Sequence, residues 1–178
     1  MNELFEEARK FIVEGKIREA IVIYEHIVKK MPDYHEARHD LARLLLECDE
    51  TDAALIVLSE GLERDHGEIS FWFLKGIIFL KLKEFSEALK SFKTVEKLEG
   101  LSTALVLNMG LVHRELGAVS VGLDLLESWL DRSEGEPQLY CLIAELNMEV
   151  QEWDKAILAV ENGLAKDEKN INLLYLKG

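Results

Sequence analysis

Among the residues of this 178-residue chain, His35, Glu36 and His39 are the best candidates for catalytic or metal-binding chemistry. They match the H-E-x-x-H pattern, in which two histidines on one helical face share a zinc ion and the glutamate acts as general base for the metal-bound water. The extended form of the pattern fails here, because Ala42 and Leu45 stand where a glycine and a third histidine are needed.

A third zinc ligand would have to come from the following helix, where Glu60, Glu63 and His66 are candidates. An acid-rich chain with five histidines is expected to match so short a pattern by chance. We therefore interpret the motif as coincidental and predict a non-enzymatic protein with no catalytic residue, no metal site and no cofactor. A metal-dependent hydrolase acting through His35, Glu36 and His39 is the alternative function.

Small residues that recur every 34 positions indicate which secondary-structure elements carry this motif. A 34-residue period without insertions is typical of stacked helix–turn–helix units, each of which buries its apolar face against its neighbours. Small side chains let the backbones of two paired helices approach closely. The two series are Ala8, Ala42, Gly76, Gly110, Ala144 and Gly178, and Ala20, Ala54, Ala88, Gly122 and Ala156.

Larger residues keep the same 34-residue step and are predicted to form the core. One series is Tyr24, Leu58, Phe92, Leu126 and Val160, and another is Ile17, Thr51, Phe85, Val119 and Trp153. The pattern predicts an all-α fold without β-sheet. We expect helices near residues 2–14, 18–30, 35–47, 52–64, 69–82, 86–98, 103–116, 120–133, 137–149, 154–166 and 171 to the end.

The third repeat carries a family signature in its aromatic and small residues, which are Trp72, Gly76, Phe79, Phe85, Ala88 and Phe92. The first repeat adds Gly15, Ala20, Tyr24 and Pro32. On these residues the chain resembles a tetratricopeptide repeat (TPR) protein over its whole length. His113 and Asn147 depart from the pattern by replacing an aromatic residue, and Lys75 and Lys177 by replacing a leucine.

The resemblance implies one array, a right-handed superhelical solenoid of stacked antiparallel helix pairs. It has five full repeats and the first helix of a sixth, with boundaries at 1–34, 35–68, 69–102, 103–136, 137–170 and, for the partial repeat, 171–178. The partial repeat is apolar from Leu173 to Leu176, whereas the end of a solenoid should present a polar face. We expect either a fragment of a longer chain or self-association through this uncapped C-terminal helix.

The charge of the chain limits its partners. A net charge of −13 argues against nucleic acid and against an anionic membrane surface. Residues 35–68 carry ten acidic and three basic residues, so the acidity is local. No apolar run suits membrane insertion, and Cys48 and Cys141 are too few for a disulfide framework. These features favour the cytoplasm.

In the family that the chain resembles, the first helices line a concave groove that binds peptides. The positions matching that role are Phe5, Arg9, His39, Arg43, Phe73, Ile77, Leu80, Leu107, Asn108, Leu111, Arg114, Cys141, Glu145, Met148 and Tyr175. Phe73 and Ile77 stand where carboxylate-clamp relatives have a lysine and an asparagine, and Asn108 matches the backbone-binding asparagine. The resemblance thus implies a scaffold or adaptor that binds a protein or peptide partner along an apolar groove. The alternative is an interaction module attached to an enzyme domain missing from this chain.

Overall fold

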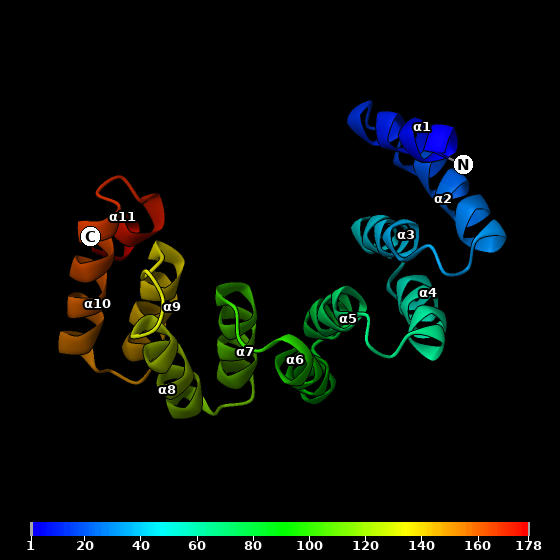
Figure 1. Cartoon of the computed structure of the whole chain (residues 1–178). Helices are drawn as coiled ribbons and strands as arrows, with labels where there is room; N and C mark the ends of the chain where they lie inside the picture. The colour runs from blue at the N-terminus through cyan, green and yellow to red at the C-terminus, as the bar shows by residue number, and fades with distance from the viewer. Residues whose placement is uncertain (1, 178) are drawn as a thin grey trace. The chain divides into compact units, whose positions relative to one another are not determined.

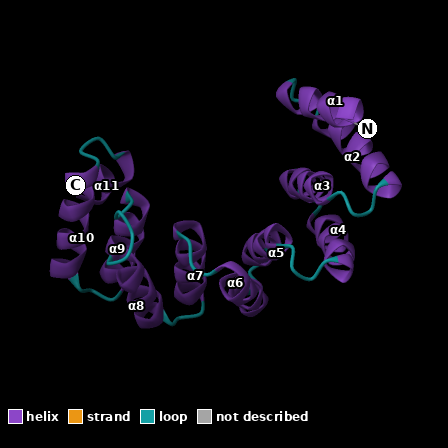
Figure 2. Cartoon of the chain, in the orientation of Figure 1, coloured by secondary structure: helices purple, strands orange, loops and turns teal. Residues whose placement is uncertain are grey.

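The computed structural model describes residues 2–177, and within this range it contains eleven helices and no strand (Figures 1 and 2). The helices form two compact units, Met1–Lys83 and Glu84–Gly178. In each unit, consecutive helices joined by short turns pack side by side. The predicted all-α fold of stacked antiparallel helix pairs is therefore confirmed.

The first unit consists of two helix pairs and one further helix. α3 packs against α2, α4 and α5, and a single hydrophobic core runs through the unit. The buried side chains of this core include Phe5, Tyr24, Leu41, Leu58 and Phe71. The five helices are α1 (Asn2–Val13), α2 (Ile17–Lys30), α3 (His35–Glu47), α4 (Thr51–Arg64) and α5 (Ile69–Lys81).

The second unit contains six helices and its own core. α7 packs against α6, α8 and α9, and α9 packs against α10 and α11. The core includes Val106, Leu126, Leu142, Val160 and Leu173. The helices are α6 (Phe85–Glu99), α7 (Thr103–Glu115), α8 (Val119–Leu130), α9 (Pro137–Glu149), α10 (Trp153–Lys166) and α11 (Ile171–Lys177).

The predicted helix boundaries agree with these bounds to within one residue, except at the end of α8. That helix ends at Leu130, three residues before the predicted end at 133. A turn follows, in which Gly135 has a φ of 72°, a left-handed conformation that glycine adopts without strain. The division between the units follows Lys83, inside the segment assigned to the third repeat, and the repeat boundaries stay a prediction.

Both series of small residues lie in the interior. Ala8, Ala20, Ala42 and Ala54 have no exposed surface, and Gly178 lies outside the described residues. In the second unit, a Cβ atom placed on Gly122 would lie 3.2 Å from the carbonyl oxygen of Gly110, so α7 and α8 approach backbone to backbone. This contact is the physical reason for small residues at both positions.

The turns inside the helix pairs repeat one backbone conformation. Residues 15, 49, 83, 117 and 151, which are 34 positions apart, all have positive φ, between 61° and 74°. Two of them are Gly15 and Gly117, whereas Asp49, Lys83 and Gln151 adopt the left-handed region despite a Cβ atom. The non-glycine residues carry a backbone strain that glycine does not.

Gln151→Gly should therefore raise the free energy of unfolding by about 1 kcal/mol, because it removes the strain of a Cβ atom at a φ of 61°. Gly117→Ala should lower it by a similar amount, since no atom lies within 4 Å of an added Cβ there and only the backbone is strained. Urea titrations followed by circular dichroism measure both changes. Equal midpoints for Gln151→Gly and Gln151→Ala would contradict the argument.

Candidate partner-binding surface

The three residues of the H-E-x-x-H motif are engaged with different partners. Nδ1 of His35 lies 2.9 Å from Oε2 of Glu68, Glu36 accepts a hydrogen bond of 2.9 Å from Arg9, and the nearest carboxylate to Nδ1 of His39 is its neighbour Asp40 at 3.9 Å. Glu36 is thus held by a cation instead of facing a shared metal position. This arrangement does not favour a hydrolase acting through the motif.

Two of the residues considered as third ligands also have other partners. Glu60 pairs with Arg38 at 3.4 Å, and the imidazole of His66 contacts the carbonyl oxygen of Leu62 in its own helix. The structure therefore does not assemble the predicted alternative zinc site.

In the first unit, the predicted groove residues lie on α1, α3 and α5, as expected. Phe5 is an exception in its exposure, because only 5% of it is accessible and its ring packs 5.5 Å from Tyr24 and 5.3 Å from Tyr34. The assignment of Phe5 as a ligand contact is corrected: it is a core residue. The guanidinium of Arg9 lies over the Phe5 ring, 4.8 Å from its centroid, so Phe5 stabilises Arg9 by a cation–π contact.

One hydrogen bond and two close charge contacts meet at Asp40 of α3. The hydroxyl of Tyr24 donates a hydrogen bond of 3.0 Å to Asp40, which also lies 3.9 Å from His39 and from Arg43. Burial acts to raise the pKa of Asp40, but the contact with His39, the hydrogen bond from Tyr24 and the charge of Arg43 outweigh it and lower the pKa. Asp40 is therefore ionised at neutral pH and orders the half-buried His39 and Arg43.

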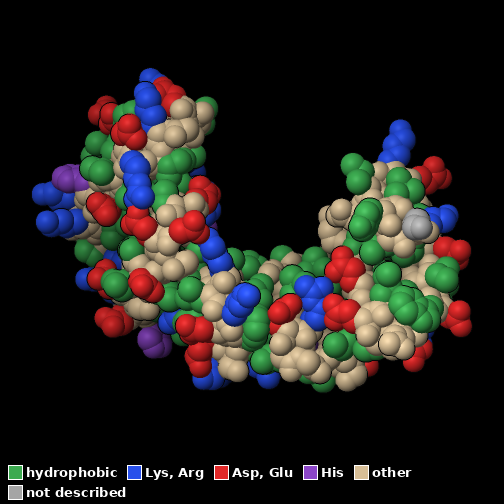
Figure 3. Space-filling view, turned by 180° about the vertical axis from the view of Figure 1, so that it is seen from behind, with side chains coloured by type: hydrophobic (Ala, Val, Ile, Leu, Met, Phe, Trp, Pro, Cys, Tyr) green, Lys and Arg blue, Asp and Glu red, His purple; other side chains and the backbone are tan. Residues whose placement is uncertain are grey.

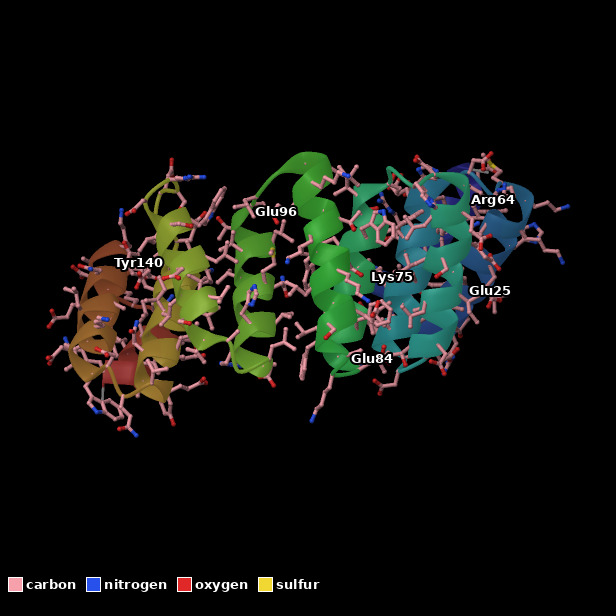
Figure 4. All side chains as sticks on the ribbon, turned by 90° about the horizontal axis from the view of Figure 1, so that it is seen from below. Glu25, Arg64, Lys75, Glu84, Glu96 and Tyr140 are labelled. Carbon is pink, nitrogen blue, oxygen red and sulfur yellow. The ribbon has the colours of Figure 1, made fainter. Side chains whose placement is uncertain are left out.

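The neighbouring helix α5 adds apolar side chains. Phe73, Ile77 and Leu80 are half-buried, so each keeps part of its surface accessible. Lys75, labelled in Figure 4, has its ammonium 5.5 Å from the Trp72 ring and 5.8 Å from the Phe79 ring. These cation–π contacts explain how a lysine is accommodated where a leucine was expected.

In the second unit, the predicted residues lie on α7, α9 and α11. Leu107 and Leu111 pack partly against the core, and the side-chain amide of Asn108 donates a hydrogen bond of 2.8 Å to the carbonyl oxygen of Ala104 in the same helix. The guanidinium of Arg114 lies 3.3 Å from Glu145 on α9. The unit therefore also combines half-buried apolar side chains with an ordered charge pair.

Cys141, Met148 and Tyr175 complete the predicted set. Burial, followed by the charge of Glu145, raises the pKa of the Cys141 thiol, which is therefore protonated at neutral pH. Met148 lines an apolar hollow of about 330 Å³ together with Trp153 and Leu176. Tyr175 on α11 is 85% exposed.

Trp153 corrects one core prediction. It is 56% exposed at the first residue of α10, where it forms the rim of this hollow.

The first unit contains a buried arginine that the repeat pattern does not predict. Arg38 is 2% exposed and donates hydrogen bonds to the carbonyl oxygens of Val57 at 2.9 Å and Pro32 at 3.1 Å. It lies at a cavity of about 600 Å³, which Glu25 and Arg64 also line. Glu25 and Arg64 are labelled in Figure 4. Its burial is not predictable from the sequence, because a charged residue in the first turn of a helix is usually solvated.

The burial of Arg38 requires a glycine at position 61, which the repeat pattern also does not predict. A Cβ atom on Gly61 would lie 2.5 Å from Cδ of Arg38 and 2.5 Å from the Phe71 ring. In the second unit, a Cβ atom on Gly163 would lie 2.8 Å from Cβ of Tyr140 and 2.6 Å from Leu173. The two glycines are three 34-residue steps apart, so the repeat contains a third position where a small residue occurs. Its sequence signal is weak, because only two repeats have glycine there.

The first helices of the pairs (α1, α3, α5, α7 and α9, with α11) carry the predicted residues, and we call their accessible sides the first-helix surfaces. Helix pairs of this kind are typical of a helical repeat protein. Residues 11–78 match the tetratricopeptide repeat family. Together with the fold, this match supports membership of the tetratricopeptide repeat family, and the fold in general supports a protein–protein interaction scaffold. Within residues 2–177, no helix combines the length and apolar character that a membrane crossing requires.

The chain is also similar to individual proteins. It is 25% identical over 172 residues to the protein O-mannosyl-transferase TMTC3 of Homo sapiens, an alignment that covers 91% of this chain but 19% of that protein. MamA from Desulfovibrio magneticus RS-1 has a TM-score of 0.83 at 14% identity, with 96% of each chain covered. YrrB, described as a TPR protein with an unusual peptide-binding site, has a TM-score of 0.75 at 12% identity and covers 98% of this chain and 90% of its own. The structural similarities show a shared fold.

Proposed function

We propose that this protein is a non-enzymatic adaptor that binds an apolar peptide or an amphipathic helix of a partner protein on its first-helix surfaces. The observation that carries the proposal is the arrangement on α3 and α5. There, the half-buried Phe73, Ile77 and Leu80 lie on the helix that packs against the one bearing His39 and Arg43. Apolar side chains supply the energy of such contacts, and charged groups at their edge orient the ligand.

The second unit supports the same function. Leu107 and Leu111 are half-buried, and Arg114 is held by Glu145 and by Glu149 at 3.7 Å. Charged groups that are already ordered lose little further side-chain entropy when a ligand binds. The proposal thus places an apolar stretch of the partner on the first helices of each unit.

The charge distribution bears on the class of partner. On the face drawn in Figure 3, acidic and basic side chains are interspersed, and no basic area stands out. A basic area is the usual feature of a nucleic-acid site, and the net charge is −13. We therefore propose a protein partner and a cytoplasmic location, for which the free thiols of Cys48 and Cys141 are suited.

Self-association through α11, whose Ile171 and Tyr175 are 80% and 85% exposed, belongs to the same proposal.

A second candidate function rests on the similarity to TMTC3. The chain spans about a fifth of the length of that transferase, so this array is also suited to be the interaction module of a longer protein. In that case the array recruits a partner or substrate while the chemistry belongs to another domain.

The binding surface can be tested with peptides selected from a random phage-displayed library on the immobilised chain. Phe73→Ala combined with Leu107→Ala should weaken the selected peptides by at least about tenfold, because truncating an anchor side chain costs more than 1 kcal/mol. Fluorescence anisotropy with the synthetic peptides measures the affinity, and circular dichroism verifies the fold.

The matched control is Ile56→Ala combined with Val121→Ala. These apolar side chains are 59% and 48% exposed, and they lie on the second helices α4 and α8. The control should leave the affinity unchanged. Peptides that bind the Phe73/Leu107 variant as tightly as the unmodified protein would move the binding surface away from the first helices.

A further inference from the structure

His35 of the motif meets two carboxylates that the motif does not contain. It is the first residue of α3, Asp65 follows α4, and Glu68 directly precedes α5. Nδ1 of His35 lies 2.9 Å from Oε2 of Glu68 and 3.8 Å from Oδ2 of Asp65, and a ligand atom of each residue lies within 4.8 Å of the others. Three potential metal ligands therefore converge from two helix starts and the connection between α4 and α5.

Each carboxylate has one oxygen held by its own loop. Oδ1 of Asp65 accepts a hydrogen bond of 2.9 Å from the backbone N–H of Gly67. Oε1 of Glu68 accepts hydrogen bonds from the backbone N–H of Ser70 at 3.2 Å and from its hydroxyl at 2.7 Å. The second oxygen of each carboxylate points at His35. This is the division of roles that outer hydrogen bonds impose on metal ligands.

The imidazole is oriented as well. Its ring lies edge-on to Phe71, with a centroid distance of 5.5 Å. The side chains of His35, Glu68 and Asp65 are 31%, 25% and 47% exposed, so the group is partly shielded from water and still accessible to an entering ion.

The geometry points to a binding site for a divalent transition-metal ion, such as zinc, formed by Nδ1 of His35, Oδ2 of Asp65 and Oε2 of Glu68. In a tetrahedral zinc site with bonds of about 2.0–2.1 Å, ligand atoms lie about 3.4 Å apart. The observed separations of 2.9 and 3.8 Å lie on either side of this value. The ligand atoms of Asp65 and Glu68 lie within 4.8 Å of each other, so small side-chain rotations bring the three ligands into place, and water takes the fourth position.

Charge and ligand type decide the class of ion. Two carboxylates beside one imidazole favour a cation at this point, and residues 35–68 carry ten acidic residues against three basic ones. A divalent cation neutralises this charge. One nitrogen and two oxygen ligands suit zinc, manganese or cobalt better than magnesium or calcium, which prefer oxygen ligands alone. The ion would clamp the start of α3 to the start of α5.

Calorimetric titration of the chelator-treated chain with zinc chloride tests the site. One zinc ion per chain should bind. His35→Gln should lower the affinity for zinc by at least about tenfold, because the substitution removes the nitrogen ligand of the site. Asp65→Asn and Glu68→Gln should lower it as well, and magnesium chloride should give no comparable heat. Zinc should also raise the thermal unfolding midpoint of the unmodified chain but not that of His35→Gln.

The matched control is His66→Gln, which removes an exposed histidine next to Asp65, and His39→Gln removes the other histidine of the motif. Both controls should bind zinc as the unmodified chain does. Unchanged affinity in His35→Gln, or an equal loss in His66→Gln, would overturn the proposal and leave His35 and Glu68 as a hydrogen-bonded pair only. Circular dichroism verifies that each variant is folded.

Discussion

Arg38→Ala is expected to lower the free energy of unfolding by about 2–4 kcal/mol. The substitution leaves the carbonyl oxygens of Val57 and Pro32 without a side-chain donor, and it empties the space of a side chain that is 2% exposed. Loss of a partner for a buried acceptor and creation of a cavity each cost on the order of 1–3 kcal/mol. Urea denaturation followed by circular dichroism measures the change.

Arg64→Ala is the matched control for this prediction. Arg64 lines the same cavity and pairs with Asp33 at 3.4 Å, but half of its side chain is exposed, and exposed ion pairs contribute less than about 1 kcal/mol. Arg38→Lys should give an intermediate loss, because one ammonium cannot reproduce the fork of a guanidinium. Equal midpoints for Arg38→Ala and Arg64→Ala would show that Arg38 has no structural role.

Gly163→Ala is expected to lower the free energy of unfolding by about 1–3 kcal/mol, although alanine is the better helix former. The added Cβ atom would lie 2.8 Å from Cβ of Tyr140, an atom fixed to the backbone of α9, and 2.6 Å from Leu173. α9 and α10 must move apart, and overpacking of this kind costs more than the gain of about 1 kcal/mol in helix propensity. Thermal and urea unfolding both report the change.

The control is Asn162→Ala, on the adjacent exposed position of the same helix. It should be neutral or slightly stabilising, because it improves helix propensity without a new contact. If Gly163→Ala stabilised the protein as much as Asn162→Ala, the close approach of α9 and α10 would be refuted.

Local features of the fold were predictable from sequence. The ends of the helices follow from the 34-residue period, because each turn must recur where the apolar pattern is interrupted. Gly15 and Gly117 suit the left-handed turn position by residue type, whereas Asp49, Lys83 and Gln151 adopt the same conformation without a glycine to indicate it. The end of α8 was missed because Asp131 to Gly135 form an extra turn inside the period.

The helices that carry the proposed site residues were also predictable, since the helix bounds follow from the 34-residue period. The exposure of individual residues was not. Phe5 is buried because two tyrosines from α2 and from the turn before α3 close over it, and Trp153 is exposed because it lies at the rim of a hollow. Both outcomes depend on neighbours that are distant in sequence.

The sequence by itself determined the helical periodicity, the small contacts within helix pairs and the helices that carry the candidate surface, because these depend on spacing along one chain. The tertiary structure decided the partners of the polar groups. It pairs His35 with Glu68, 33 residues away, and joins Arg38 to the carbonyl oxygen of Val57 across two helices. Such pairs form when packing brings particular side chains within hydrogen-bonding distance, and a repeat pattern that specifies size and polarity does not specify which charges meet.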